Sequence, residues 1–134
     1  RKKMFIKISH NERSNSRNAP NVSVIIACYN HGKFLREAFK SVIKQTYQDF
    51  EIIIVNDGST DNTKQVAEKL QLECETPSIR LINQRNSGLP AVALNVGIKS
   101  ARGRYILPLN ADDKLHPYSR EVYFNAAKKF RRYH

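Results

Sequence analysis

Four short apolar segments recur along the chain at nearly constant intervals, and a helical pattern separates each from the next. The segments are residues 22–27, 50–56, 79–83 and 105–109, and their starts lie 28, 29 and 26 residues apart. Each is rich in β-branched or aromatic residues, which favours strands buried on both faces. Strands that alternate with helices need right-handed crossovers and form a mostly parallel sheet. The pattern predicts an α/β fold with about four strands and flanking helices.

The intervening segments carry the apolar spacing of amphipathic helices. Residues 34–43 place their apolar side chains on one stripe, with most of the charged residues outside it. Residues 61–63 offer N-caps for a second helix, and Pro90 suits the first turn of a third that Gly103 would end. Apolar residues between Val122 and Phe130 have the same spacing, so we expect a fourth helix there.

The first 20 residues differ from the rest of the chain. They are basic, rich in Ser, Asn and Arg, and lack apolar periodicity, which is typical of a flexible tail. The folded part is expected to begin near Asn21, and the length of 134 residues suits one domain. Because residue 1 is Arg and not Met, we expect the chain to be part of something longer.

Several classes of protein are disfavoured. No apolar run approaches the roughly 20 residues that span a bilayer, and the start of the chain lacks the apolar core of a secretory signal. The two cysteines, Cys28 and Cys74, are too few and too far apart for a disulfide scaffold or a zinc knuckle. Reduced thiols and no signal predict a cytoplasmic protein.

The chain is strongly basic. It has 23 Lys and Arg against 12 Asp and Glu, a formal net charge of +11. Such an excess attracts nucleotide phosphates, nucleic acid or an anionic membrane surface, and composition does not choose among them. Basic residues cluster at both ends of the chain, in residues 1–3 and 128–132, where they would suit contact with the inner face of a membrane.

Polar and ionisable residues follow every predicted strand. Because the carboxyl ends of parallel strands meet at one edge of a sheet, where ligands bind near the reversal of strand order, these loops should converge. Each loop taken alone also suits a helix cap or a turn, such as Asn30, Asp61 or Asp57-Gly58. Together they predict a binding cleft. The loops are residues 28–32, 57–61, 84–88 and 110–113.

The common phosphate-binding loops are missing from the sequence. There is no G-x-G-x-x-G after the first strand and no G-x-x-x-x-G-K-[ST], which disfavours a dinucleotide fold and a P-loop hydrolase. A nucleotide could still bind if a metal on Asp112 and Asp113 offset its phosphate charge, because the carboxylates would repel a bare diphosphate. Oxygen ligands of this kind suit Mg²⁺ or Mn²⁺.

These four loops resemble, in order, those of the inverting GT-A glycosyltransferases of family 2, which use nucleotide sugars. Residues 22–30 are similar to that family's first strand and loop, and residues 45–61, with their N-D-G-S-T-D segment, to its second. Residues 86–97 and 101–113 are similar to the third and fourth. The resemblance covers about residues 21–117 and implies a Rossmann-like GT-A half-domain.

The resemblance implies roles for individual residues. Tyr29 and its neighbours would wall the nucleobase, since an aromatic face stacks on any base. Asp57 would accept a hydrogen bond from the base, as in uracil recognition by similar enzymes. The residues expected to bind the donor are Ala27, Cys28, Tyr29, Asn30, Asp57, Asn86, Gly88, Asn110 and Ala111.

The resemblance also implies a metal site. Asn110-Ala111-Asp112 stands where the family has its D-x-D motif, so Asp112 would bind Mn²⁺ or Mg²⁺ and Asp113 would assist. The metal would act as a Lewis acid on the departing nucleoside diphosphate.

Three positions depart from the family pattern. Ala27 replaces the usual Pro, and Leu94 stands where an Arg is common, with Arg85 or Arg104 as open alternatives for its contact. Asn110 replaces the first Asp of D-x-D, which keeps an oxygen ligand, removes a charge and should weaken metal binding.

The acceptor side of the reaction is not evident in this sequence. In similar enzymes the acceptor site and the general base lie beyond D-x-D, whereas here Glu121 is the one acidic residue after Asp113 and no base is assigned. Residues 21–134 are therefore expected to be the donor-binding part of a glycosyltransferase domain, with the base beyond His134. The expected partners are a nucleotide-sugar donor, for instance a UDP-sugar, and a saccharide, lipid or protein acceptor in cell-wall or polysaccharide biosynthesis.

The sequence leaves two other functions open. A non-catalytic basic module would bind nucleic acid or an anionic surface, although no nucleic-acid partner is expected from the resemblance. A sugar-nucleotide-forming nucleotidyltransferase would share the cleft, but such enzymes usually open with a Gly-rich loop after the first strand, which this sequence lacks.

Overall fold

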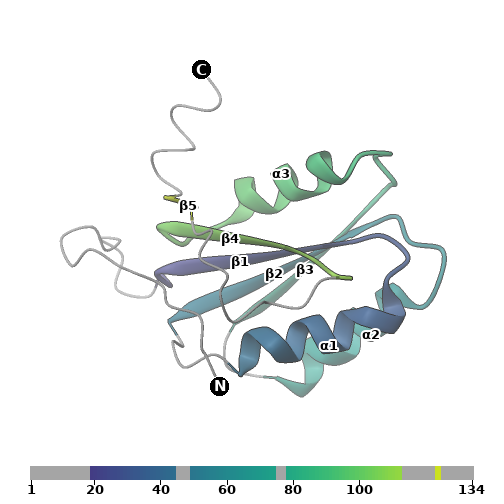
Figure 1. Ribbon diagram of the computed structural model, residues 1–134, viewed down its shortest axis with the longest axis horizontal. Coiled ribbons are helices and arrows are strands. Elements are labelled where there is room, and N and C mark those ends of the chain that lie inside the picture. The colour runs from purple at the N-terminus through teal and green to yellow at the C-terminus, as the bar shows by residue number, and fades with distance from the viewer. Residues whose placement is uncertain (1–18, 45–48, 75–77, 113–122, 125–134) are drawn as a thin grey trace.

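A five-stranded sheet with helices on both faces forms the centre of the molecule (Figure 1). The computed structural model describes residues 19–44, 49–74, 78–112 and 123–124. The first four strands pair in parallel, and β5 runs antiparallel to β4, so the predicted mostly parallel sheet is confirmed. The strands are β1 (Val22–Cys28), β2 (Phe50–Asp57), β3 (Ile79–Gln84), β4 (Tyr105–Asn110) and β5 (Tyr123–Phe124).

Each of the four parallel strands extends one residue past its predicted carboxyl end. All four added residues lie opposite a residue of a neighbouring strand in the ladder of backbone pairs. They are Cys28, Asp57, Gln84 and Asn110. The apolar pattern stops before them because strand pairing uses the backbone, which is indifferent to a polar side chain. The strands therefore carry these four side chains to the carboxyl edge of the sheet.

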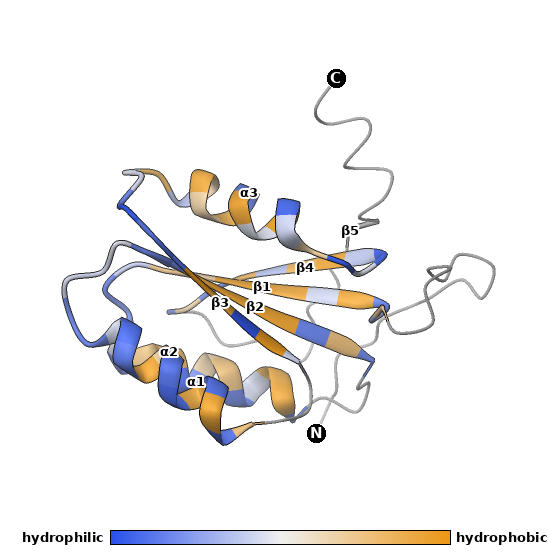
Figure 2. Cartoon of the chain, turned by 180° about the vertical axis from the view of Figure 1, so that it is seen from behind, coloured by the Kyte–Doolittle hydropathy of each residue, from blue (hydrophilic) through white to orange (hydrophobic). Residues whose placement is uncertain are grey.

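Helices cover the two faces unequally. α1 (Gly32–Ile43) and α2 (Thr63–Glu73) lie on one face and α3 (Pro90–Ser100) on the other (Figure 1). Alternate side chains of β1 pack on opposite faces of the sheet. Val24 and Ile26 lie in the core under α1 and α2, and Ile25 lies in the core under α3. Figure 2 shows the strands mostly in hydrophobic colours between these helix layers. β1 and β2 are buried along their whole length and β4 along most of it, as their apolar segments predict. The same prediction is wrong for β3, which is mostly half-buried because it is an edge strand of the sheet.

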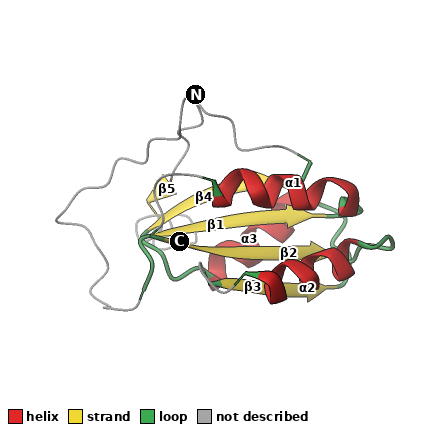
Figure 3. Cartoon of the chain, turned by 90° about the horizontal axis from the view of Figure 1, so that it is seen from below, coloured by secondary structure: helices red, strands yellow, loops and turns green. Residues whose placement is uncertain are grey.

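The order of strands across the sheet is β3-β2-β1-β4-β5. The chain moves outward from β1 through β2 to β3 and then returns to place β4 on the other side of β1. Figure 3 shows the arrowheads of β1, β2 and β3 at one edge of the sheet. In sheets of this kind ligands bind at the carboxyl edge where the order reverses, which here lies between β1 and β4.

A buried ionic cluster lies at the opposite, amino end of β2. The Glu51 side chain is 1% exposed, and its Oε1 is 3.0 Å from Arg80 and 3.3 Å from Arg102. Its Oε2 accepts hydrogen bonds from the Ser23 hydroxyl at 2.6 Å and from the Arg102 N–H at 2.8 Å. Burial alone would raise the pKa of Glu51, but these donors and the Arg80 charge outweigh it and lower that pKa below its ordinary value.

The helix expected between Val122 and Phe130 is wrong at Tyr123 and Phe124, which form β5. Phe124 pairs with Tyr105 and Tyr123 with Ile106. β5 pairs with the edge of β4 that faces away from β1, and such pairing satisfies backbone groups that an edge strand leaves open, whereas apolar spacing carries no information about a partner strand. The other residues of that segment lie outside the described part, as do residues 1–18 of the predicted tail.

The sequence suggested that Gly103 ends α3, but the structure shows that it does not. The helix ends at Ser100, and Ala101 takes the cap position with its N–H bonded to the Ile98 carbonyl. Gly103 instead lies against β1, where an added Cβ would come within 2.7 Å of the Ser23 nitrogen. This close approach lets the Gly103 N–H donate to the Ser23 hydroxyl at 2.8 Å.

Among the described residues, none of the helices has the length and apolar character needed to cross a bilayer.

Candidate functional site

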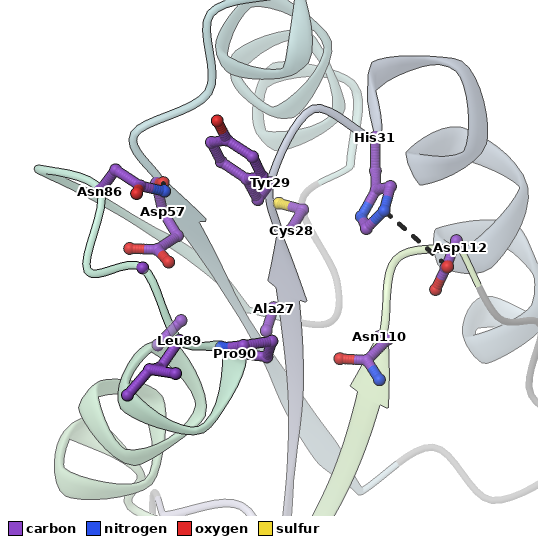
Figure 4. A pocket seen from close by; sticks show the side chains of 12 residues that line it. Ala27, Cys28, Tyr29, His31, Asp57, Asn86, Leu89, Pro90, Asn110 and Asp112 are labelled. Atoms are coloured by element: carbon purple, nitrogen blue, oxygen red, sulfur yellow. Dashed lines mark hydrogen bonds and ion pairs between the residues drawn. The ribbon is translucent and has the colours of Figure 1, made fainter.

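A cavity of about 320 Å³ lies at the carboxyl ends of β1, β2 and β4 (Figure 4). This is the edge at which the sequence predicted converging loops. No Lys or Arg among the described residues lines it, although the chain is strongly basic. Its lining residues are Ala27, Cys28, Tyr29, His31, Asp57, Asn86, Gly88, Leu89, Pro90, Ala93, Asn110 and Asp112.

Eight of the eleven predicted site residues line this cavity. Asn30 and Ala111 do not, and Asp113 lies outside the described residues. Ala111 is buried, and its N–H donates to the Ala27 carbonyl at 3.0 Å, so it holds the β4 loop against β1. Four further residues line the cavity that were not predicted from the sequence: His31, Leu89, Pro90 and Ala93. His31 could have been found, because it belongs to the loop that follows the first strand.

The β1 loop contributes an aromatic face and a thiol. Tyr29 is 45% exposed, so its ring is open to a planar ligand. Cys28 is buried, and its Sγ–H donates to the Val55 carbonyl at 3.4 Å. Burial, and then the nearby charges of Asp61 and Asp57, raise the pKa of Cys28 to about 12. The thiol is therefore neutral at physiological pH and unsuited to act as a nucleophile.

Asn30 joins two loops instead of facing the cavity. It has a left-handed backbone with φ of 56°, which Asn tolerates better than most residues. Its Oδ1 accepts hydrogen bonds from the backbone N–H of Thr60 at 2.8 Å and of Asp61 at 3.2 Å. Its own N–H donates to the Ser59 hydroxyl at 2.9 Å. Asn30 thus fixes the β1 loop on the β2 loop.

Asp61 caps the helix that follows the β1 loop. The Gly32 N–H, at the start of α1, donates to its Oδ2 at 3.1 Å, while Thr63 donates its N–H to Oδ1 at 2.9 Å. Neither α1 nor α2 receives a hydrogen bond from the side chain at its own N-cap position. Burial opposes ionisation, but the hydrogen bonds from Thr63 and Gly32 prevail and lower the pKa of Asp61. One carboxylate therefore anchors the starts of both helices.

Asp57 lies at the end of β2 and is 3% exposed. Its Oδ1 accepts from Gln84 Nε2 at 2.8 Å and from the Ser87 N–H at 2.9 Å, and its Oδ2 accepts from the Ser87 hydroxyl at 2.8 Å. Burial raises the pKa of this carboxyl, yet the donors outweigh it and the pKa is lowered. Asp57 is therefore an ionised acceptor held by neutral groups, and Figure 4 shows its carboxylate directed into the cavity.

The turn after β2 depends on Gly58. Its φ of 72° is one that residues with a Cβ rarely adopt, and an added Cβ would come within 2.3 Å of the Asn86 nitrogen. This contact brings the β3 loop over the end of β2, where Asn86 Nδ2 donates to the Asp57 carbonyl at 2.8 Å. Gly58 thereby places Asn86 in the cavity wall.

Asp112 and His31 face each other on the β4 side of the cavity (Figure 4). Their Nε2 and Oδ2 atoms are 3.8 Å apart, and the Asp112 side chain is 51% exposed. Asn110, at the end of β4, lines the same wall. Within the described residues there is no group of three or more His, Cys, Asp or Glu side chains placed to hold a metal alone. A cation there would need ligands from a bound molecule or water as well.

Comparison with known proteins agrees with this geometry. Residues 23–132 match the family described as glycosyl transferase family 2. The chain is 41% identical over 92 residues to the glycosyltransferase GlyG of Streptococcus pneumoniae, covering 69% of this chain and 30% of that protein. It is 43% identical over 106 residues to the uncharacterized glycosyltransferase YibD of Escherichia coli, covering 79% of this chain and 30% of that protein. The chain thus spans about 30% of the length of these relatives.

The fold of this chain also resembles that of proteins with solved structures. The S. aureus protein TarS, residues 1–349 in complex with UDP, superposes with a TM-score of 0.65 and 33% identity, covering 73% of this chain and 29% of that one. The sheet and helices described above are therefore arranged as in a GT-A glycosyltransferase.

Proposed function

The chain belongs to glycosyltransferase family 2, and from this premise we propose that its cavity binds the nucleoside diphosphate of a sugar donor, with UDP as the nucleotide. The observation that carries the proposal is the cavity at the reversal of strand order, which has Tyr29 and Asp57 on one side and Asn110 and Asp112 on the other. Residues 21–134 are then the donor-binding part of the enzyme.

The Tyr29 and Asp57 side of the cavity suits a uracil. The open ring of Tyr29 offers a stacking face, which adds affinity for any base. Asp57 supplies selectivity, because an ionised carboxylate only accepts hydrogen bonds. Uracil has an N–H donor at its N3 position, whereas the N3 atom of cytosine is an acceptor. A likeness to TarS, solved in complex with UDP, supports the same nucleotide.

The Asp112 side of the cavity suits a diphosphate only with a cation. Asp112 is exposed and no described Lys or Arg lines the cavity, so phosphate oxygens there would meet a carboxylate without a compensating positive side chain. Mg²⁺ or Mn²⁺ fits the oxygen donors of Asp112 and Asn110. When bound, such an ion supplies Lewis-acid stabilisation of the leaving diphosphate.

Sugar transfer with inversion needs a general base near the acceptor hydroxyl. Among the described residues, two carboxylates line the cavity, Asp57 and Asp112, and both are assigned to the donor in this proposal. We place the base and the acceptor site outside the described residues. A saccharide, lipid or protein could serve as the acceptor.

Calorimetric titration of the 134-residue chain with UDP, CDP, ADP and GDP, in Mn²⁺ and in chelator, tests the proposal. We expect UDP to bind at least several-fold more tightly than CDP, and more tightly in Mn²⁺ than in chelator. Equal affinity for all four nucleotides would remove the role of Asp57, and no binding of any nucleotide would remove the function.

The basic-module alternative is tested beside it with a labelled single-stranded oligonucleotide at rising salt. Binding through phosphate contacts should weaken steeply as salt increases. Oligonucleotide binding that exceeds UDP binding at physiological salt would favour that alternative.

A further inference from the structure

We propose that His31 is a nitrogen ligand of the divalent cation at this site, and that it acts together with Asp112. This rests on the proposed binding of a nucleoside diphosphate. It adds a ligand from the β1 loop to a metal site that the sequence places on the β4 loop alone. The consequence is a preference for transition-metal ions, such as Mn²⁺ and Co²⁺, over Mg²⁺.

His31 is positioned to reach a cation beside Asp112. Its imidazole lines the cavity, and Figure 4 shows it directed toward the Asp112 carboxylate. The backbone around it is held in place, because the His31 N–H donates to the Thr63 hydroxyl at 3.1 Å and Asp61 caps the next residue, Gly32. A rigid loop therefore presents the imidazole to the carboxylate across the boundary between β1 and β4.

The separation of the two side chains suits a shared cation. Metal bonds of about 2.1 Å place two ligand atoms about 3 Å apart when they are adjacent in an octahedron and about 4.2 Å apart when they are opposite. The observed distance of 3.8 Å from Nε2 to Oδ2 lies between these two values, so a small movement of the half-exposed Asp112 side chain would bring the pair to either one. It is too long for a direct hydrogen bond.

The two ring nitrogens differ in access. Nδ1 is shielded from solvent and has no hydrogen-bond partner among the described residues. The imidazole as a whole keeps 27% of its surface exposed, which leaves Nε2, the atom nearest Asp112, as the nitrogen that an ion can reach.

The composition of the cavity gives the chemical reason. Asn110 provides a neutral oxygen where a second carboxylate would bind a hard cation more strongly, and His31 is the basic side chain that lines this cavity within the described residues. Imidazole is a good ligand for first-row transition ions, whereas Mg²⁺ is bound mainly by oxygen. A His-Asp pair thus compensates for Asn110 with transition ions and much less with Mg²⁺.

The test measures metal binding directly on the full chain with UDP present. Spin-echo spectroscopy of bound Mn²⁺ should detect a coordinated imidazole nitrogen in the native chain and lose it in His31→Ala. Calorimetry should show the Mn²⁺ affinity of His31→Ala reduced about tenfold or more and its Mg²⁺ affinity changed less than twofold. A control chain with Ala at His10, His116 and His134 should keep both the nitrogen signal and the native Mn²⁺ affinity.

Two results would overturn the inference. One is UDP binding that Mn²⁺ strengthens equally in the native chain and in both His31→Ala and His31→Gln. The other is a native spectrum without coordinated nitrogen. Either leaves the proposed function standing, since UDP binding is measured in the same titrations, whereas absence of UDP binding in the native chain would remove the function and the inference together.

Discussion

Strand β2 carries a buried carboxylate at each end, and the two have opposite kinds of neighbours. Glu51, near the amino end, has two arginines, a hydroxyl and a backbone N–H around it. Asp57, at the carboxyl end, has only neutral donors from Gln84 and Ser87. The Glu51 charge is neutralised within the protein, whereas the Asp57 charge faces a cavity.

The difference separates a structural carboxylate from a binding one. The Glu51 cluster joins β1, β2, β3 and the segment after α3, and it leaves little for an external ligand to satisfy. Asp57 accepts three hydrogen bonds, and a carboxylate can accept about four, so it keeps capacity for one more donor. Both residues are almost inaccessible to solvent, so burial alone does not indicate which carboxylate binds a ligand.

Glu51→Ala should have the largest effect on the molecule. It would leave the Ser23 hydroxyl and the Arg102 N–H without their acceptor in a buried setting, and we expect a loss of about 2 to 4 kcal/mol in the free energy of unfolding. Urea denaturation measures this change. Asp57→Asn, which keeps the shape at the other end, should lose much less stability, and an equal loss in both would erase the contrast between the two ends.

Asp57→Ala should weaken UDP binding by about 1 to 3 kcal/mol, because it removes the acceptor for the base. Calorimetry of a variant shown to be folded by circular dichroism measures the loss. Glu51→Gln is the matched control on the same strand and should bind UDP as the native chain does. Unchanged UDP affinity in Asp57→Ala would show that the carboxylate does not contact the base.

Asp112→Asn should remove most of the enhancement of UDP binding by Mn²⁺ and leave the fold intact, since the side chain is half exposed. The expected change is about tenfold in UDP affinity with Mn²⁺ and little in chelator. If native affinity is the same with Mn²⁺ and with chelator, the loop after β4 is not a metal site.

Acid should destabilise the native fold through both ends of β2. The pKa values of Glu51 and Asp57 are lowered in the folded chain, so their stabilisation is complete above the pKa of the unfolded chain and is lost as pH falls through the folded values. Stability measured by urea should therefore decline below about pH 4.5, the ordinary value for Glu. Glu51→Gln should show a shallower decline, and a slope equal to the native one would exclude Glu51 as a contributor.

Asn110→Asp should have the smallest effect, a severalfold gain in Mn²⁺ affinity with UDP present. It adds a second anionic oxygen on the wall that Asp112 and His31 share. Mn²⁺ titration at constant UDP measures the gain. A decrease in affinity would mean that Asn110 contacts the nucleotide through its amide instead of the ion.

Much of the fold was predictable because its signals are local. The spacing of apolar residues located four strands and three helices, and Pro90 marks the start of α3 as predicted. The helix predicted over Tyr123 and Phe124 failed because β5 depends on a partner strand about 18 residues earlier in the sequence. Gly103 was misassigned for the same reason, since its neighbour is Ser23.

The site was predictable as a set of loops and not in its details. Eight of the predicted residues line the cavity because each follows a parallel strand, and such strands end at one edge. Asn30 was grouped with them by adjacency to Tyr29, yet its amide oxygen turns to Thr60 and Asp61. Which way a loop side chain points depends on partners from another loop, which spacing does not encode.

The sequence by itself therefore determined the family, the parallel sheet and the edge at which its functional loops meet, because periodicity and motif order are properties of the chain. Only the tertiary structure decided that Glu51 is neutralised and Asp57 is not, that Asp61 caps α1, and that His31 faces Asp112. Each of these depends on contacts between residues about 30 to 80 positions apart, and hydrogen bonds and charges act through space over a few ångströms regardless of separation along the chain.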